Sequence, residues 1–446
     1  MGRFPDGFLW GAATSAYQIE GSPLADGAGP SNWHRFCRLK GAIMNGDTGD
    51  VACDHYRRFR EDVALMRALG LPSYRFSIAW SRVLPDGRGQ PNTKGLDFYA
   101  RLVDLLLEAG IQPLVTLHHW DLPAALDDRG GWTNRDSVEW FADYAHLMFE
   151  RLADRVTLWA TLNEPVLMSD AGYVKGVHAP GRRSVSEAAA VARHLLLAHG
   201  AAVEAFRGTA KGAIGIVVNL EPREPATGAA MDVEASRRAD VYYNRQYLHP
   251  ILTGDWPAGL AEILGPECRD FTATERERVT RPIDWVGVNY YSRRITRHGA
   301  DPPLFADDVP IGGDRATDFG WEIYPEGLTR ILTEVTERYG KIPLYVTENG
   351  AAFNDPEPEL DGVVEDPRRV AYLRDHLAAT LTAIERGADV RGYFAWSLLD
   401  NFEWQAGYSK RFGLIRVDFD SQRRTLKRSA EFYREVMASH GAALAV

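Results

Sequence analysis

The sequence of 446 residues predicts a closed (β/α)₈ barrel, the TIM-barrel fold. Strand-like apolar segments alternate with amphipathic helix-like segments along the whole chain, a pattern typical of a parallel sheet covered by helices. Eight such units are present. A doubly wound open sheet would carry a glycine-rich phosphate-binding turn, and the sequence contains none. The long irregular segments follow strands, as they do in barrels whose functional loops gather at one end.

The first helix illustrates how the elements are assigned. Between Asp54 and Leu69, apolar residues recur every three or four positions, which is the period of one helix face. Gly70 suits the end of this helix, and Pro72 prevents its continuation. The same alternation continues to the end of the chain. The predicted strands are 8–13, 74–78, 114–117, 157–162, 213–219, 284–289, 344–347 and 393–396. The predicted helices are 54–69, 93–109, 133–153, 185–207, 234–249, 325–338, 367–386 and 427–438.

The remaining long segments are predicted to be loops at the carboxyl ends of the strands, where barrel enzymes build their active sites. They are residues 20–53, 164–184, 220–233, 291–322 and 349–366. The sequence contains no linker between independent domains, no low-complexity run and no short internal repeat. A single barrel domain spanning residues 1–446 is therefore expected.

Composition narrows the possible functions. The formal net charge of −10 and the lack of a basic stripe argue against nucleic acid or an anionic membrane surface as a partner. No apolar stretch reaches the roughly 18 residues of a membrane span, and the first residues do not form a secretory signal. The three cysteines show no C-x-x-C spacing, which favours free thiols in a reducing compartment. We expect a soluble, cytoplasmic protein.

Two short segments carry the strongest chemical information. Glu164 and Glu348 each follow an apolar run and precede a residue that breaks the strand, Pro165 or Gly350. One strand-end glutamate alone is more often a helix cap or an ion-pair partner of an arginine. Two of them at the same end of a barrel match the acid/base and nucleophile that glycoside cleavage requires.

Polar and aromatic residues also accumulate where the other predicted strands end. Adjacent residues on a strand point to opposite faces, so His118 and His119 do not form a metal-binding pair, and only one of them is expected to face the site. No H-E-x-x-H motif is present. The strand-end residues are Gln18, Arg75, His118, His119, Trp120, Asn163, Glu164, Asn289, Tyr290, Tyr291, Glu348, Trp396, Glu403 and Trp404.

Five stretches give the chain a specific resemblance. They are residues 8–21, 74–80, 118–123, 161–165 and 346–350. In order and spacing they resemble the family 1 glycoside hydrolases, the retaining β-glucosidase family, and the resemblance extends along essentially the whole chain.

The resemblance implies a role for each site residue. Glu348 would be the nucleophile and Glu164 the acid/base, with Arg75 and Tyr291 holding Glu348 ionised and oriented. The positions that match sugar-binding residues of the family are Gln18, His119, Trp120, Asn163, Asn289, Trp396, Glu403, Trp404 and Phe412. Trp321, Val166 and His178 match the aglycone side.

The implied activity is hydrolysis of terminal β-D-glucosyl residues, with β-D-galactosyl and β-D-fucosyl residues as alternatives, from small glycosides and cello-oligosaccharides. No cofactor or metal is expected. Members that act on 6-phosphorylated sugars replace the residue at the Glu403 position, and this carboxylate would repel a phosphate group. Thioglucosidase-like members lack the acid/base, which Glu164 supplies here.

The sequence is also compatible with two other functions. Val166 stands where the family often has an aromatic residue, so the aglycone specificity cannot be read and transglycosylation is an alternative to hydrolysis. A catalytically inactive sugar-binding protein could use the same fold, but such proteins typically lose a catalytic carboxylate, and both are present. Sugar preference, substrate length and oligomeric state are not encoded in a recognisable pattern.

Overall fold

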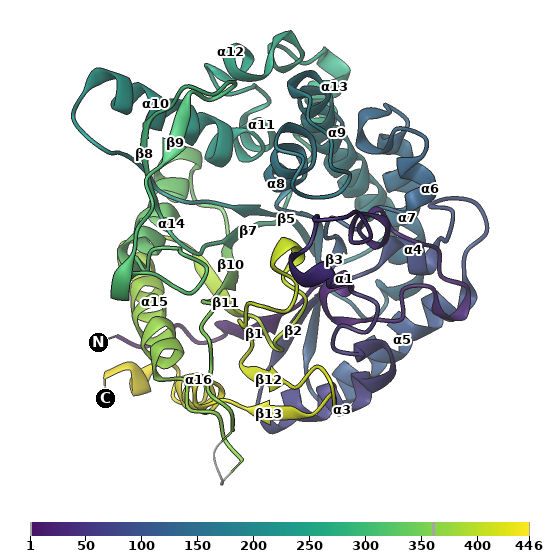
Figure 1. Cartoon of the computed structure of the whole chain (residues 1–446). Coiled ribbons are helices and arrows are strands. Elements are labelled where there is room, and N and C mark those ends of the chain that lie inside the picture. The colour runs from purple at the N-terminus through teal and green to yellow at the C-terminus, as the bar shows by residue number, and fades with distance from the viewer. Residues whose placement is uncertain (1, 359–361, 446) are drawn as a thin grey trace.

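The computed structural model describes residues 2–358 and 362–445, and its centre is a closed barrel of eight parallel strands (Figure 1). The order around the barrel is β1-β11-β10-β7-β5-β4-β3-β2, so the predicted fold is confirmed. The barrel strands are β1 (Leu9–Ala13), β2 (Ser73–Ser77), β3 (Gln112–His118), β4 (Leu158–Asn163), β5 (Ala213–Asn219), β7 (Trp285–Asn289), β10 (Leu344–Asn349) and β11 (Val390–Trp396).

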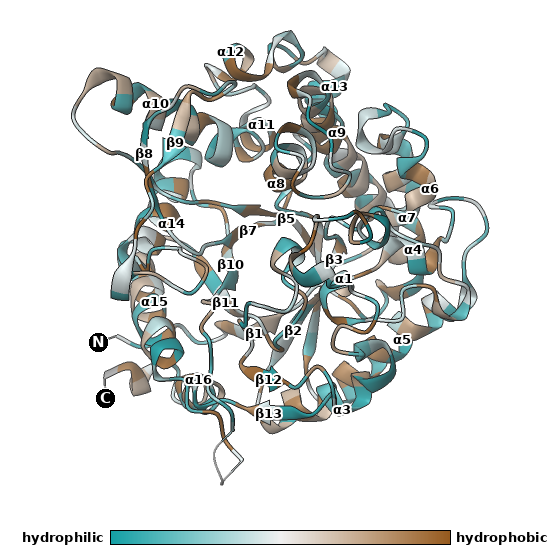
Figure 2. Cartoon of the chain, in the orientation of Figure 1, coloured by the Kyte–Doolittle hydropathy of each residue, from teal (hydrophilic) through white to brown (hydrophobic). Residues whose placement is uncertain are grey.

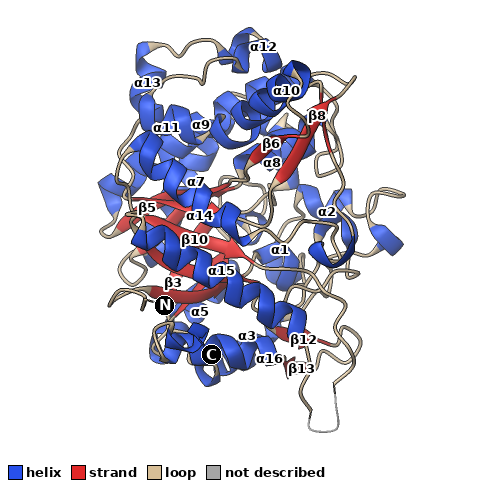
Figure 3. Cartoon of the chain, turned by 90° about the vertical axis from the view of Figure 1, so that its left-hand side faces the viewer, coloured by secondary structure: helices blue, strands red, loops and turns tan. Residues whose placement is uncertain are grey.

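Long helices surround this barrel, as Figure 3 shows with helices outside the central strands. They are α3 (His55–Ala68), α5 (Thr93–Glu108), α7 (Ser137–Leu152), α9 (Val185–Thr209), α10 (Ala230–Asp240), α14 (Pro325–Tyr339), α15 (Pro367–Glu385) and α16 (Arg428–Ala438). Hydrophilic and hydrophobic residues alternate along these helices in Figure 2, as expected for elements with one face on the barrel and one in solvent.

Shorter helices lie mainly in the connections. They are α1 (Ala16–Ile19), α2 (Asn32–Phe36), α4 (Trp80–Val83), α6 (Ala124–Asp127), α8 (Pro165–Ser169), α11 (Leu248–Thr253), α12 (Leu260–Leu264) and α13 (Ala273–Val279). Two π-helical turns span Asp170–Val174 and Val241–Arg245. Short 3₁₀ turns span Ala25–Gly27, Met44–Gly46, Gly131–Thr133, Pro266–Cys268, Gly313–Arg315, Trp404–Ala406 and Ala442–Ala445.

The predicted helix 234–249 is wrong as one continuous element. Helix α10 begins earlier, at Ala230, and passes into the π turn before α11 starts at Leu248. Pro250 lacks a backbone N–H, which a helix tolerates only in its first turn. Because α11 begins at Leu248, Pro250 lies in the first turn of a new helix.

Two small sheets in the connections were not predicted. One contains β6 (Arg223–Pro225), β8 (Arg294–His298) and β9 (Ala306–Asp308), and it lies beside α10 (Figure 1). The other is a hairpin of β12 (Ile415–Val417) and β13 (Arg424–Leu426). Both arise in stretches that are short and rich in charge, where hydrophobic alternation gives no signal. Of the predicted loop 349–366, residues 359–361 lie outside the described residues.

The barrel interior is filled by side chains rather than open. Gly215 on β5 is needed for this packing, because a Cβ there would lie 2.4 Å from the carbonyl oxygen of Trp285. The interior cluster contains Ala13, Leu114, Leu158, Ala160, Val217, Trp285, Phe394 and Trp396. Among the described residues, no helix is both long enough and apolar enough to cross a membrane.

Candidate active site

The two glutamates singled out in the sequence lie at the carboxyl ends of β4 and β10, which β5 and β7 separate in the barrel. Glu164 directly follows β4 and has a left-handed backbone with φ of 46°, after which Pro165 begins α8. Glu348 lies near the end of β10, where it is in register with Asn289 at the end of β7. The strand-end positions expected for both glutamates are confirmed.

Glu348 is held by one donor on each carboxylate oxygen. Arg75 Nη1 donates to Oε1 at 2.6 Å, and the Tyr291 hydroxyl donates to Oε2 at 2.6 Å. The side chains of Arg75 and Glu348 are 1% and 4% exposed, so this ion pair is removed from water. One donor on each oxygen restricts the rotation of the carboxyl group.

Glu164 is in a different electrostatic environment. Its Oε1 accepts a hydrogen bond of 2.8 Å from Asn289 Nδ2. Burial, followed by repulsion from the charge of Glu348, raises the pKa of Glu164 to about 8. The structure therefore keeps one carboxyl group protonated near neutral pH beside a second that is paired with a cation.

This arrangement predicts a pH-dependent stability. The pKa of Glu164 is about 8 in the folded protein and about 4.5 in an unfolded chain, so the folded state binds the extra proton between those values. That contribution is fully present below about pH 4.5 and is lost as the pH rises through 8. The melting temperature of the wild type should therefore fall more between pH 5 and pH 9 than that of Glu164→Gln.

The control is Glu108→Gln, because Glu108 is exposed at the end of α5. Its melting curve should follow that of the wild type at every pH. Parallel curves for the wild type and Glu164→Gln would contradict the assignment of a proton to Glu164.

A chain of hydrogen bonds joins the strand ends around the glutamates. Asn163 Oδ1 accepts from Arg75 Nη2 at 2.7 Å and from Asn289 Nδ2 at 3.1 Å. Its amide nitrogen then faces His119 Nε2 at 3.0 Å, so that nitrogen of the imidazole acts as the acceptor. Burial, with the charge of Arg75, lowers the pKa of His119 well below its usual value, consistent with a neutral ring. His118 instead packs against Trp80, as expected for one of the pair.

A cavity of about 340 Å³ opens over these groups. Its lining combines the two glutamates with indole and phenyl rings, which suit the polar edges and C–H faces of a sugar. Of the residues expected at the site, it is lined by His119, Trp120, Glu164, His178, Asn289, Tyr291, Trp321, Glu348, Trp396, Glu403, Trp404 and Phe412.

Four expected residues lie outside this lining. Arg75 and Asn163 act on residues that do line it, as described above. Gln18 is fully buried and donates to Asn401 Oδ1 at 3.0 Å and to the Phe402 carbonyl at 2.9 Å. Gln18 is therefore bonded to the segment that leads to Glu403.

The expectation that Val166 lies on the aglycone side requires correction. Its side chain is buried in the hydrophobic core and does not line the cavity, whereas Leu167 does. Successive residues of a helix point about 100° apart, and α8 directs Leu167 rather than Val166 toward the opening.

Residues that the sequence did not single out form the outer part of the cavity. They are Leu167, Asp170, Ala171, Lys175, Val177, Asn219, Leu220, Glu221, Arg223, Tyr243, Arg294, Asp308, Phe319 and Gln405. Glu221 pairs there with Arg223 and, at 3.0 Å, with Arg294. Asn219 ends β5, so the strand-end rule that identified the other site residues would also have identified it. The charged residues on β6, β8 and β9 could not be found by the strand-end rule, because these strands form a sheet that the sequence did not predict.

Comparisons with known proteins agree along the chain. The model of the family described as Glycosyl hydrolase family 1 matches residues 1–442. Beta-glucosidase A of Thermotoga maritima is 48% identical over 441 residues, which cover 98% of each chain. The 1,4-beta-D-glucan glucohydrolase of Thermotoga neapolitana is 46% identical, covering 99% of each.

Solved structures give the same picture. The family 1 β-glucosidase of Thermotoga maritima matches with a TM-score of 0.95 and 47% identity over 98% of each chain. The β-glucosidase of that organism in complex with deoxynojirimycin also matches with a TM-score of 0.95, covering 99% of this chain and 100% of the other.

Proposed function

This chain belongs to glycosyl hydrolase family 1 and is a retaining β-glucosidase, and we propose that Glu348 is its nucleophile and Glu164 its acid/base. The observation that carries the proposal is the contrast between the two carboxyl groups. Glu348 is paired with Arg75 and Tyr291, whereas Glu164 has its pKa raised to about 8. Glycoside cleavage with retention needs one carboxylate to attack and one carboxylic acid to donate a proton.

In the first step, a Glu348 oxygen forms a bond to the anomeric carbon while the bond from that carbon to the leaving oxygen breaks. Glu164 donates its proton to the leaving oxygen, so the aglycone departs as a neutral alcohol. The sugar is then attached to Glu348 as an ester of inverted, α configuration.

In the second step, water attacks the anomeric carbon from the side the aglycone has left. Glu164, now a carboxylate, accepts the proton of that water, and Glu348 leaves as a carboxylate. Burial and the charge of Glu348 both raise the pKa of Glu164, and esterification of Glu348 removes the second of these causes, which lowers the pKa of Glu164 for the second step. The same residue can therefore act as an acid in the first step and as a base in the second.

The sugar subsite is proposed to lie around Glu403 and the indoles of the cavity. Trp396 Nε1 lies 3.4 Å from Glu403 Oε1, and Trp404 and Trp120 pack with ring centroids 4.6 Å apart. The carboxyl group of Glu403 offers hydrogen-bonding oxygens to sugar hydroxyls, and the indole rings offer faces that pack on the C–H groups of a sugar. Gln18 is bonded to the Phe402 carbonyl and Asn163 to His119, so both are proposed to orient this region, and His119 and Phe412 complete its wall. Trp321 and His178 are assigned to the aglycone side.

The substrates proposed are terminal β-D-glucosides of small glycosides and cello-oligosaccharides, in support of cellulose breakdown. The name 1,4-beta-D-glucan glucohydrolase, carried by two of the relatives, supports this class. The cations near Glu403 do not favour a phosphorylated sugar. Lys410 Nζ is bonded to the Asp318 carbonyl at 2.5 Å and Arg411 is paired with Asp400 at 2.8 Å, and neither lines the cavity.

The experiment that tests the function compares p-nitrophenyl β-D-glucoside, β-D-galactoside and 6-phospho-β-D-glucoside, with Glu348→Gln as the control. Rapid turnover of the unphosphorylated glucoside, lost in the variant, is expected. Activity only on the phosphorylated sugar would overturn the assignment of Glu403. Absence of activity on all three would point to a sugar-binding protein.

The acid role of Glu164 predicts a limb in the pH profile. The protonated form predominates below pH 8 and is lost above it, so kcat/KM for cellobiose should fall about tenfold per pH unit above about pH 8. Burial also raises the pKa of Glu403 to about 8. The limb should therefore be measured in Glu403→Gln, where it is expected to persist at the same pH. Its disappearance in that variant would assign the titration to Glu403.

A cytoplasmic location is also proposed. Cys37, Cys53 and Cys268 are all buried free thiols, which suits a reducing compartment. Fractionation of the native organism with an antibody to the protein would test it, and recovery in the secreted fraction would contradict it.

A further inference from the structure

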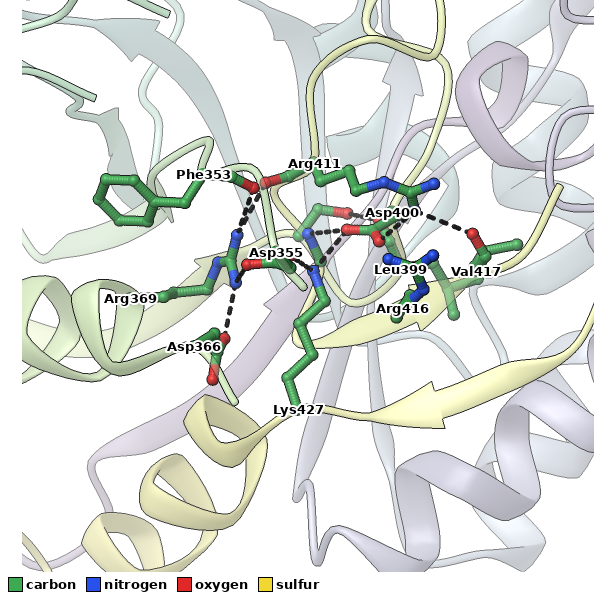
Figure 4. Close-up of polar contacts among 12 residues, drawn as sticks. Phe353, Asp355, Asp366, Arg369, Leu399, Asp400, Arg411, Arg416, Val417 and Lys427 are labelled. Carbon is green, nitrogen blue, oxygen red and sulfur yellow. Dashed lines mark hydrogen bonds and ion pairs between the residues drawn. The ribbon is translucent and has the colours of Figure 1, made fainter. Parts of the chain in front are cut away.

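A cluster of six charged side chains, five buried and one half-buried, lies outside the cavity lining and has no part in the mechanism described above (Figure 4). Three carboxylates face three cations, so the formal charges cancel. The members of this ionic cluster are Asp355, Asp366, Asp400, Arg369, Arg411 and Lys427. Five of these side chains are at most 2% exposed, and that of Arg411 is 21% exposed.

Asp400 is the centre of the cluster. Its Oδ1 accepts from Lys427 Nζ at 2.7 Å and from the Gly413 backbone N–H at 2.9 Å. Its Oδ2 accepts from Arg411 Nη1 at 2.8 Å. The carboxylate is thus held by two cations and one amide without any contact to solvent.

These contacts hold two segments that line the cavity. Asp400 begins the short stretch that carries Glu403 and Trp404. Phe412 lies between Arg411 and Gly413, which both donate to Asp400. Backbone bonds also join residues 397–400 to residues 412–415. They run from Asp400 N to the Ile415 carbonyl at 2.9 Å, from Ser397 N to the Phe412 carbonyl at 3.2 Å, from Leu414 N to the Ser397 carbonyl at 2.8 Å and from Ile415 N to the Leu398 carbonyl at 3.0 Å.

Lys427 links a third segment to the same point. Its Nζ donates to Asp355 Oδ2 at 2.5 Å, and Asp355 lies in the connection that follows the strand of Glu348. Arg369, on α15, then donates to Asp355 Oδ1 at 2.8 Å and to the Arg411 carbonyl at 2.8 Å. Figure 4 shows these side chains converging from separate parts of the chain.

Stability alone is a weak explanation for such a cluster. Removing several charges from water costs free energy that their attraction only partly returns, and well-packed apolar side chains often stabilise a core as much. What the cluster adds is directional contacts, each with a defined partner and distance. Directional contacts fix the relative positions of the segments that bear them.

We propose that Asp400, held by Lys427 and Arg411, is a positioning residue for the sugar subsite that sets where Glu403, Trp404 and Phe412 stand relative to Glu348. This inference rests on the proposed function only in assigning those three residues to the sugar. None of the six residues lines the cavity, so the effect of the cluster must act through the residues that do and appear in how the sugar is recognised.

The test is Asp400→Asn, which removes one charge and places an amide group against two cations and an N–H. Values of kcat/KM are measured for p-nitrophenyl β-D-glucoside, β-D-galactoside, β-D-fucoside and β-D-xyloside, which share one leaving group and differ only in the sugar. Active sites are counted by covalent labelling with a 2-deoxy-2-fluoro-β-D-glucoside, so that unfolded protein does not enter the rates.

A shift of about 1 Å in positioning groups can cost about a hundredfold in rate, so a loss of about tenfold to a hundredfold per labelled site is expected for the glucoside. The ratios among the four sugars should also change, because their contacts to Glu403 and its neighbours differ. Equal losses for all four sugars, or none, would overturn the proposal.

Asp62→Asn is the matched control. Asp62 is also a fully buried carboxylate with two partners, His55 at 2.7 Å and Arg424 at 2.9 Å, but neither it nor these partners line the cavity. The Asp62→Asn variant should be less stable than the wild type, but the ratios of kcat/KM among the four glycosides, measured per labelled site, should not change. A change of the ratios in Asp62→Asn as large as in Asp400→Asn would overturn the proposal.

If Asp400→Asn does not fold, Arg411→Gln becomes the test of the proposal. The Arg411 side chain is partly exposed, and its replacement removes only one contact to Asp400. Altered sugar ratios in this variant support the proposal, and unchanged ratios or failure to fold overturn it as a purely structural cluster. An inactive wild type would instead refute the proposed function, so the two failures are distinct.

Discussion

Replacing Glu348 with alanine is expected to abolish turnover, with a loss in kcat on the order of 10⁶-fold, the size seen when a covalent nucleophile is removed from an enzyme. The variant keeps Arg75 and Tyr291 but has no carboxylate between them to attack the anomeric carbon. The space left by the side chain can admit a small anion. Added azide should therefore attack the anomeric carbon of a β-glucoside that has a good leaving group, from the face that the Glu348 carboxylate occupied. The product should be an α-glucosyl azide, identified by NMR.

The configuration of that product decides the assignment. Glu348→Gln is the control, because it removes the nucleophile but leaves little space for azide, so rescue should be much weaker. A β-glucosyl azide from Glu348→Ala would show that the residue attacking from the α face is still present and would refute the role of Glu348.

Replacing Glu164 with alanine should produce the second largest effect, and it should depend on the leaving group. Cellobiose and alkyl glucosides need a proton on the departing oxygen, and their kcat/KM should fall by about 10²–10⁴-fold, the usual contribution of a general acid. A dinitrophenyl glucoside needs no proton to leave, so pre-steady-state release of the phenol should remain fast. The glycosyl-enzyme should then accumulate, because no base activates water.

Azide should also rescue Glu164→Ala, but the product should be the opposite anomer. The glycosyl-enzyme on Glu348 has the α configuration, and azide needs no base to attack it from the other face, which gives a β-glucosyl azide. A uniform loss across all leaving groups would contradict the acid role. Opposite anomers from the two alanine variants would establish both glutamates in one experiment.

Most of the barrel could be predicted because its strands and helices follow local rules. Apolar runs gave all eight barrel strands to within a few residues, and Gly70 marked the end of the first helix correctly. The polar residues at the strand ends were brought together because parallel strands in a closed barrel point their carboxyl ends in one direction. That rule placed Glu164, Asn289 and Glu348 around one cavity.

The outer cavity depends on pairings that local rules do not describe. Arg223, Arg294 and Asp308 meet through a sheet of three short strands, in which β8 pairs with the nearby β9 but also with β6, which is far away in the sequence. Val166 and Leu167 are adjacent, and only the direction in which α8 leaves the barrel decides which one faces the opening. The ionic cluster depends on tertiary structure even more, because all of its pairs except Asp366–Arg369 join separate segments of the chain.

The closed barrel also has a consequence for how the protein is made. Strand β1 pairs with β2 on one side and with β11 on the other, so one edge of β1 has no partner until residues 390–396 have left the ribosome. At about 5–20 residues per second, the interval between synthesis of β2 and of β11 is on the order of tens of seconds. During that time the nascent chain exposes an unpaired parallel edge and the apolar helix faces that should cover the sheet. Lys427 is made later still, so the contact of Asp400 with Lys427 forms only after the last barrel strand has been synthesised.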